Sequence, residues 1–152
     1  MPPPQSRCGH ASDPPQWGAT HEQLKRWRVW CTTWMRQAEP SERFVYTVKV
    51  SELITHVERF EGVRDLVLDF GHIADLLGPR FGCFLFQLPP SFTYTPARLE
   101  AIVDGLDPAR RNVVEFRHGS WWNDEVYRAF RERGIVFCSC SGPRLPEELV
   151  KT

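Results

Sequence analysis

The sequence has no net charge, no long hydrophobic run and no even set of cysteines. Its 19 basic and 19 acidic residues cancel, so no overall field attracts nucleic acid or an anionic membrane, and we expect neither as a partner. No apolar run approaches the roughly 20 residues that cross a bilayer. Residues 1–13 are rich in proline and lack the apolar stretch of a signal peptide. We therefore expect a soluble, cytoplasmic protein.

The sequence also lacks a regular metal-ligand spacing. The five cysteines stand at irregular intervals, which is atypical of a disulfide framework and favours reduced thiols. Cys8 and His10 match no closed four-ligand site. Glu115, His56 and His118 fit a divalent ion only in a favourable geometry. We therefore expect no metal and no cofactor.

The apolar content is sufficient for one folded domain. Of the 152 residues, 41% are hydrophobic and 12% are aromatic, which supports a sizeable core. Residues 1–21 instead concentrate proline among small and polar residues, a composition typical of disorder. We expect a disordered tail over residues 1–21 and a single domain over residues 22–152.

Helical and strand periodicities alternate along that domain. Helices are expected at residues 22–37 and 62–77, after Thr95-Pro96, after Ser120 or Asn123, and from Glu147 or Glu148. Strands are expected near residues 44–50, 81–88, 112–118 and 135–140. This order predicts βαβ units, and therefore an α/β fold with a parallel sheet and covering helices.

The chemistry is concentrated in residues 112–122, Asn-Val-Val-Glu-Phe-Arg-His-Gly-Ser-Trp-Trp. Strand alternation places Val113, Glu115 and Arg117 on one face of a largely buried run. Ionised groups are costly to bury unless they are paired. Glu115 and Arg117 therefore either form a structural ion pair or line a cavity that admits a ligand.

Four polar side chains on three of the expected strands share the same position. Lys49, Gln87, Glu115 and Arg117 lie near strand ends, opposite the bulky face that helices would cover. Because ligands of parallel α/β sheets bind at the carboxyl edge of the strands, this edge is the predicted site. A structural role is the alternative for each, with Lys49 as an ion-pair partner and Gln87 as a buried amide bonded to the backbone.

Three further residues join the candidate site. His56 and His118 carry imidazole, a common general acid or base, and Trp121 can form a pocket wall. The alternatives are loop histidines with satisfied hydrogen bonds and a core tryptophan. Cys138 and Cys140 lie on one strand face, which is more typical of packing than of a redox pair.

Several separated motifs lie in one order along the chain. They are Phe44-Val45-Tyr46-Thr47-Val48-Lys49, Ile54-Thr55-His56, Leu77-Gly78-Pro79-Arg80-Phe81-Gly82, Leu85-Phe86-Gln87-Leu88-Pro89-Pro90, Val114-Glu115-Phe116-Arg117-His118 and Ser120-Trp121. In this order they resemble the YecE-like family, the domain of unknown function numbered seventy-two. The resemblance implies a (β/α) barrel of the triosephosphate-isomerase (TIM) type. It also implies that Lys49, His56, Gln87, Glu115, Arg117 and His118 lie about the barrel mouth, and it implies no established reaction.

The resemblance runs from about residue 34 to residue 149 and covers only part of such a barrel. A full barrel has eight strands and roughly 250 residues, whereas four strands are expected here. We therefore expect about half of a TIM-type barrel, a truncated domain with its lumen open to water. Its edge strands, near residues 44–50 and 135–140, would lack partners, so we expect marginal stability or self-association.

Three functions fit these residues. In the first, an enzyme or enzyme remnant uses Glu115, His118 and Lys49 for catalysis and Arg117, Gln87, His56 and Trp121 to bind an anionic or polyhydroxylated small molecule. The second is a non-catalytic binding or scaffolding module. The third is an inactive fragment of a full barrel.

Overall fold

The computed structural model describes residues 21–37 and 44–152. The tail expected over residues 1–21 lies outside the described residues, except for His21. The helices are α1 (His21–Gln37), α2 (Arg64–Phe70), α3 (His72–Leu77), α4 (Pro96–Gly105) and α5 (Asp124–Arg133), with short helical turns η1 (Leu53–Val57), η2 (Gly78–Arg80) and η3 (Gly119–Trp121). The strands are β1 (Tyr46–Lys49), β2 (Phe81–Leu88), β3 (Asn112–Phe116) and β4 (Val136–Cys138).

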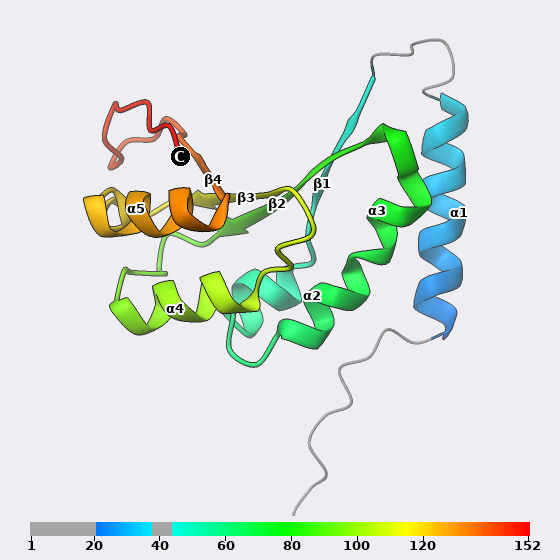
Figure 1. Cartoon of the computed structure of the whole chain (residues 1–152), viewed down its shortest axis with the longest axis horizontal. Coiled ribbons are helices and arrows are strands. Elements are labelled where there is room, and N and C mark those ends of the chain that lie inside the picture. The colour runs from blue at the N-terminus through cyan, green and yellow to red at the C-terminus, as the bar shows by residue number, and fades with distance from the viewer. Residues whose placement is uncertain (1–20, 38–43) are drawn as a thin grey trace, which may run out of the picture.

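The four strands form one sheet in the order β1-β2-β3-β4, and every neighbouring pair is parallel (Figure 1). The predicted parallel sheet is therefore confirmed, and each strand lies within its predicted range. The register places Gln87 beside Glu115 and Glu115 beside Cys138, in one row across three strands. Lys49 pairs with Leu85, two residues before Gln87.

The two faces of the sheet differ in burial. Phe86, Leu88 and Val114 are at most 1% exposed, and they belong to the face that packs against the helices. Figure 1 shows α2, α3 and α4 on that side of the sheet. The opposite face, which we call the uncovered face, carries Thr47, Lys49, Cys83, Leu85, Gln87, Val113, Glu115, Val136 and Cys138. No helix of the described residues lies across it, and Val136 is 40% exposed.

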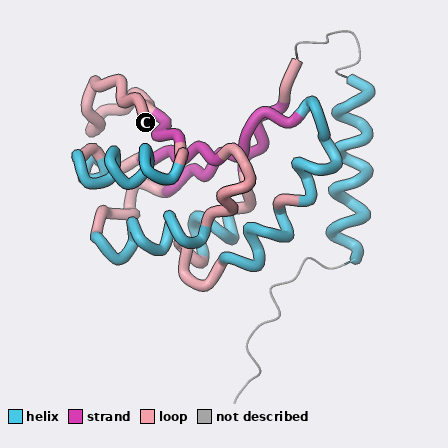
Figure 2. Tube along the Cα trace, in the orientation of Figure 1, coloured by secondary structure: helices cyan, strands magenta, loops and turns pink. Residues whose placement is uncertain are grey.

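Two helix predictions need correction. The helix expected over residues 62–77 divides at Gly71, where a Cβ atom would lie only 2.8 Å from the carbonyl oxygen of Leu68. The helix expected from Glu147 or Glu148 does not form, and residues 146–152 belong to no helix or strand. Figure 2 shows this last segment as a loop that ends beside β4.

As expected, no further strand among residues 21–37 and 44–152 pairs with either edge of the sheet. The main chain of β4 is contacted by Thr152, whose hydroxyl accepts a hydrogen bond from Phe137 N. At the other edge, no strand among residues 21–37 and 44–152 pairs with the outer side of β1.

Candidate functional site

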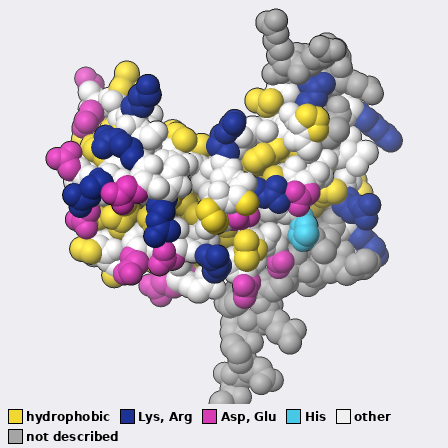
Figure 3. All heavy atoms as spheres, viewed as in Figure 1, with side chains coloured by type: hydrophobic (Ala, Val, Ile, Leu, Met, Phe, Trp, Pro, Cys, Tyr) yellow, Lys and Arg dark blue, Asp and Glu magenta, His cyan; other side chains and the backbone are white. Residues whose placement is uncertain are grey.

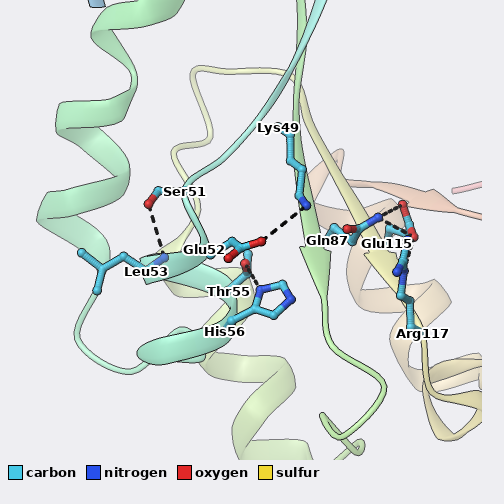
Figure 4. A network of polar contacts seen from close by, with 9 residues as sticks. All are labelled: Lys49, Ser51, Glu52, Leu53, Thr55, His56, Gln87, Glu115 and Arg117. Carbon is cyan, nitrogen blue, oxygen red and sulfur yellow. Dashed lines mark hydrogen bonds and ion pairs between the residues drawn. The ribbon is translucent and has the colours of Figure 1, made fainter. Parts of the chain in front are cut away.

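Glu115 is the most buried charged residue of the predicted site. It is 9% exposed, and both of its carboxylate oxygens accept hydrogen bonds from Gln87 Nε2, at 3.0 and 3.1 Å (Figure 4). Arg117 Nε donates to Oε1 at 2.9 Å. The register explains the first contact, because Gln87 and Glu115 stand side by side on β2 and β3. This polar cluster offsets much of the cost of burying a carboxylate.

A pocket of about 450 Å³ opens beside this cluster. Glu115 and Arg117 form one side of it, together with Pro90 and Cys140. The other side is the loop after β4, residues 141–145. The Arg117 side chain is 48% exposed, so its guanidinium remains accessible to a ligand.

Two thiols next to Glu115 are held in their neutral form. The pKa of Cys138 is raised, first by burial and then by the negative charge of Glu115. The pKa of Cys140 is raised by the same two causes, and the Arg117 guanidinium opposes the shift. Cys140 Sγ also donates weakly to Phe116 O at 3.5 Å. Neutral thiols are poor nucleophiles.

Lys49 and His56 form a second polar group, at the end of β1. Lys49 Nζ lies 4.0 Å from Glu52 Oε1, and both side chains are largely exposed. His56 Nδ1 shares a hydrogen bond of 2.8 Å with the hydroxyl of Thr55. Figure 4 shows this group on the β1 side and the Glu115 cluster on the other. No hydrogen bond or ion pair of the described residues joins the two groups.

His118 and Trp121 do not line the pocket. His118 Nδ1 accepts a hydrogen bond from Ser120 N, which caps η3. Trp121 is fully buried, and its ring stacks on Phe116 with centroids 4.1 Å apart. Its indole donates to Phe92 O at 2.7 Å. The structure therefore places Trp121 in the helix-covered core rather than in a pocket wall.

The sequence reasoning missed the loop over residues 141–145. The predicted strand over residues 135–140 ends just before this loop, and no role was assigned to the residues after it. The sequence offered one signal for this loop, namely its place directly after a predicted parallel strand. Loops in that place line the ligand sites of parallel sheets. Arg144, a second cation in the pocket lining, was missed for the same reason.

No described group of three or more histidine, cysteine or acidic residues is arranged to hold a metal ion. No described helix is both long and apolar enough to span a membrane.

The fold and the site together define an α/β domain with a polar pocket at the carboxyl edge of a parallel sheet. The chain belongs to the family described as "Protein of unknown function DUF72", whose model matches residues 22–151. This confirms the resemblance inferred from the motifs. No curated protein matches the chain.

A solved structure of the same family supports the assignment. The chain is similar to a DUF72 family protein from Thermotoga maritima, with 30% sequence identity and a TM-score of 0.60. The match covers 73% of this chain and 44% of that one. The chain therefore spans less than half the length of this relative.

Proposed function

We propose that the pocket beside Arg117 binds a small anionic molecule. The proposal rests on which nitrogens of the Arg117 guanidinium are already hydrogen-bonded and which are not. Glu115 accepts from Arg117 Nε and so fixes the guanidinium plane. The two terminal nitrogens of Arg117 have no hydrogen-bond partner among residues 21–37 and 44–152. Such a fork suits a carboxylate or phosphate, which it can hold with two charge-assisted hydrogen bonds.

The pocket composition supports an anionic ligand better than a polyhydroxylated one. Pro90, Pro143 and Leu145 supply apolar walls, and Arg144 adds a second positive charge. The one carboxylate in the lining, Glu115, is already engaged by Gln87 and Arg117. A ligand with an anionic head and a compact apolar body fits these walls.

Catalysis by the same site is the second candidate. Glu115 lines the pocket and is the residue that would act as general acid or base. Its proposed helpers lie elsewhere, since Lys49 is near Glu52 and His118 caps η3. This separation favours binding without turnover.

An NMR titration with inorganic phosphate and with malonate tests the binding proposal. We expect both anions to shift amide signals in residues 141–145, and glycerol to leave them unchanged. Arg117→Gln should weaken binding about 10- to 100-fold, because a hydrogen bond to a charged group contributes roughly 1.5–3 kcal/mol. Arg128→Gln, on the exposed side of α5, is the matched control and should bind normally. Equal affinity in the Arg117→Gln chain would exclude this pocket.

We also infer that the four-stranded unit is about half of a TIM-type (β/α) barrel. The parallel strands in sequential order, the helices on one face and the partial match to a longer relative support this inference. In such a barrel the uncovered face would line the lumen, and the pocket would lie at its mouth.

A further inference from the structure

We propose that a small cleft at the amino edge of the sheet binds the head group of an α-amino acid. Two arginines at its rim would hold the carboxylate, and an asparagine and an aspartate would hold the ammonium. These residues are Arg64, Arg133, Asn112 and Asp104. The cleft has a volume of about 150 Å³ and lies where α4 and α5 end and β3 begins. It is therefore a separate site from the pocket at the carboxyl edge.

The side-chain oxygen of Asn112, which lines the cleft, is a buried acceptor without a donor. The residue is 3% exposed, and its Nδ2 donates to Asp107 O at 2.8 Å and to Arg110 O at 3.1 Å. Turning the amide round would place its oxygen against those two carbonyl oxygens, so the orientation is fixed. Oδ1 has no hydrogen-bond partner among residues 21–37 and 44–152. Buried acceptors are normally satisfied, so this oxygen calls for a donor.

The ends of α4 and α5 favour a cation as that donor. The two helices lie side by side (Figure 1) and end at Gly105 and Arg133, next to the cleft. The carboxyl end of a helix carries a partial negative charge. Asp104, in the last turn of α4, adds a full charge that is weakly paired, because Arg133 Nη2 lies 4.0 Å from its Oδ1. An ammonium that donates to Asn112 Oδ1 would interact favourably with both.

Arg64 and Arg133 supply the positive charge for a carboxylate. Arg64 Nη1 donates to Asp104 O, which fixes this side chain across the end of α4. The Arg133 side chain is 59% exposed. Guanidinium groups bind carboxylates through charge-assisted hydrogen bonds. The carboxylate would therefore lie at the rim, with the ammonium deeper in the cleft.

The size and the surroundings of the cleft fit a small zwitterion. A cavity of this volume holds roughly one benzene molecule, and alanine is of similar size. The rest of the lining is apolar and consists of Val103, Leu106, Pro108 and Ile135. Figure 3 shows basic and acidic side chains interspersed over α4 and α5. Because neither sign of charge dominates there, a molecule that carries both charges suits this surface better than a simple anion or cation.

An NMR titration with L-alanine tests the proposal, and propionate and ethylamine are the matched probes that carry one charge each. We expect alanine to cause saturable shifts in the amide signals of residues 103–112 and 133–135. The side-chain amide signal of Asn112 should shift as well, because its oxygen would gain a donor. Propionate and ethylamine should each bind about tenfold more weakly, since each lacks one charged contact.

Substitutions at the rim test the two charged contacts without changing the core. Arg133→Gln should weaken alanine binding about tenfold, because one guanidinium is lost. Arg128→Gln, on the same helix and exposed, is the matched control and should bind alanine normally. Asp104→Asn should weaken alanine binding and should not weaken binding of propionate, which has no ammonium.

Four results would overturn the proposal. If propionate binds as tightly as alanine, the cleft is a simple anion site, and if ethylamine does so, it is a cation site. Normal alanine binding by Arg133→Gln would exclude the carboxylate contact. The absence of saturable shifts near Asn112 would mean that water alone satisfies its oxygen. Signals of residues 141–145 report the other pocket, so failure of anion binding there leaves this test interpretable.

Discussion

At the scale of single residues, Glu115 affects its surroundings mainly through its charge. It is buried with Gln87 and Arg117 as hydrogen-bond donors, and its charge contributes to the raised pKa values of Cys138 and Cys140. Because only the thiolate reacts with alkylating agents, these two thiols should react slowly near neutral pH.

Glu115→Gln should therefore speed alkylation of Cys138 and Cys140. The substitution removes the negative charge and lowers both pKa values, although burial, the larger cause, remains. Iodoacetamide labelling of the peptide over residues 134–144, followed by mass spectrometry from pH 7 to 10, should give a rate profile displaced to lower pH. Glu100→Gln, on the exposed side of α4, should leave the profile in place. An unchanged profile in Glu115→Gln would mean that the carboxylate does not act on the thiols.

At the scale of elements, helix starts were predictable because a cap is a local interaction. Thr95 accepts a hydrogen bond from Arg98 N, and Asn123 accepts one from Val126 N at 3.1 Å. Asn123 also donates to Ser120 O, which joins η3 to α5. Both caps agree with the sequence prediction. For α5 the prediction offered Ser120 or Asn123, and Asn123 is the residue that caps the helix.

Asn123→Ala should destabilise the protein by about 1 kcal/mol, the usual cost of losing an N-cap. Asn123→Asp should retain most of the stability, because a carboxylate accepts the same bond and interacts favourably with the helix dipole. Urea unfolding followed by circular dichroism measures both. If Asn123→Ala and Asn123→Asp lose the same stability, the cap contributes nothing.

Other elements could not be predicted because their structure depends on distant contacts. The segment over residues 146–152 has acidic residues typical of a helix start, yet its end is fixed by bonds from Thr152 and Val150 to β4 and the residues beside it. The break at Gly71 is local instead: a Cβ atom there would lie 2.8 Å from Leu68 O, and helical periodicity does not reveal it. The strands were predictable since alternation determines which face is buried. The pocket loop over residues 141–145 was not predictable from the sequence, because its contacts form only when β3 and β4 lie together.

At the scale of the whole molecule, the unequal burial of the two sheet faces concentrates stability on one side. Leu88 is fully buried beneath helices, whereas Leu85, three residues earlier on the same strand, is half-buried on the uncovered face. Leucine to alanine substitutions at these two positions remove the same atoms from opposite faces. The difference between them therefore measures how far each face is covered in solution.

In dilute protein, Leu88→Ala should cost about 2–5 kcal/mol and Leu85→Ala roughly half of that or less. Urea unfolding of both variants provides the measurement. Equal costs in dilute protein would mean that the uncovered face is already packed within one chain.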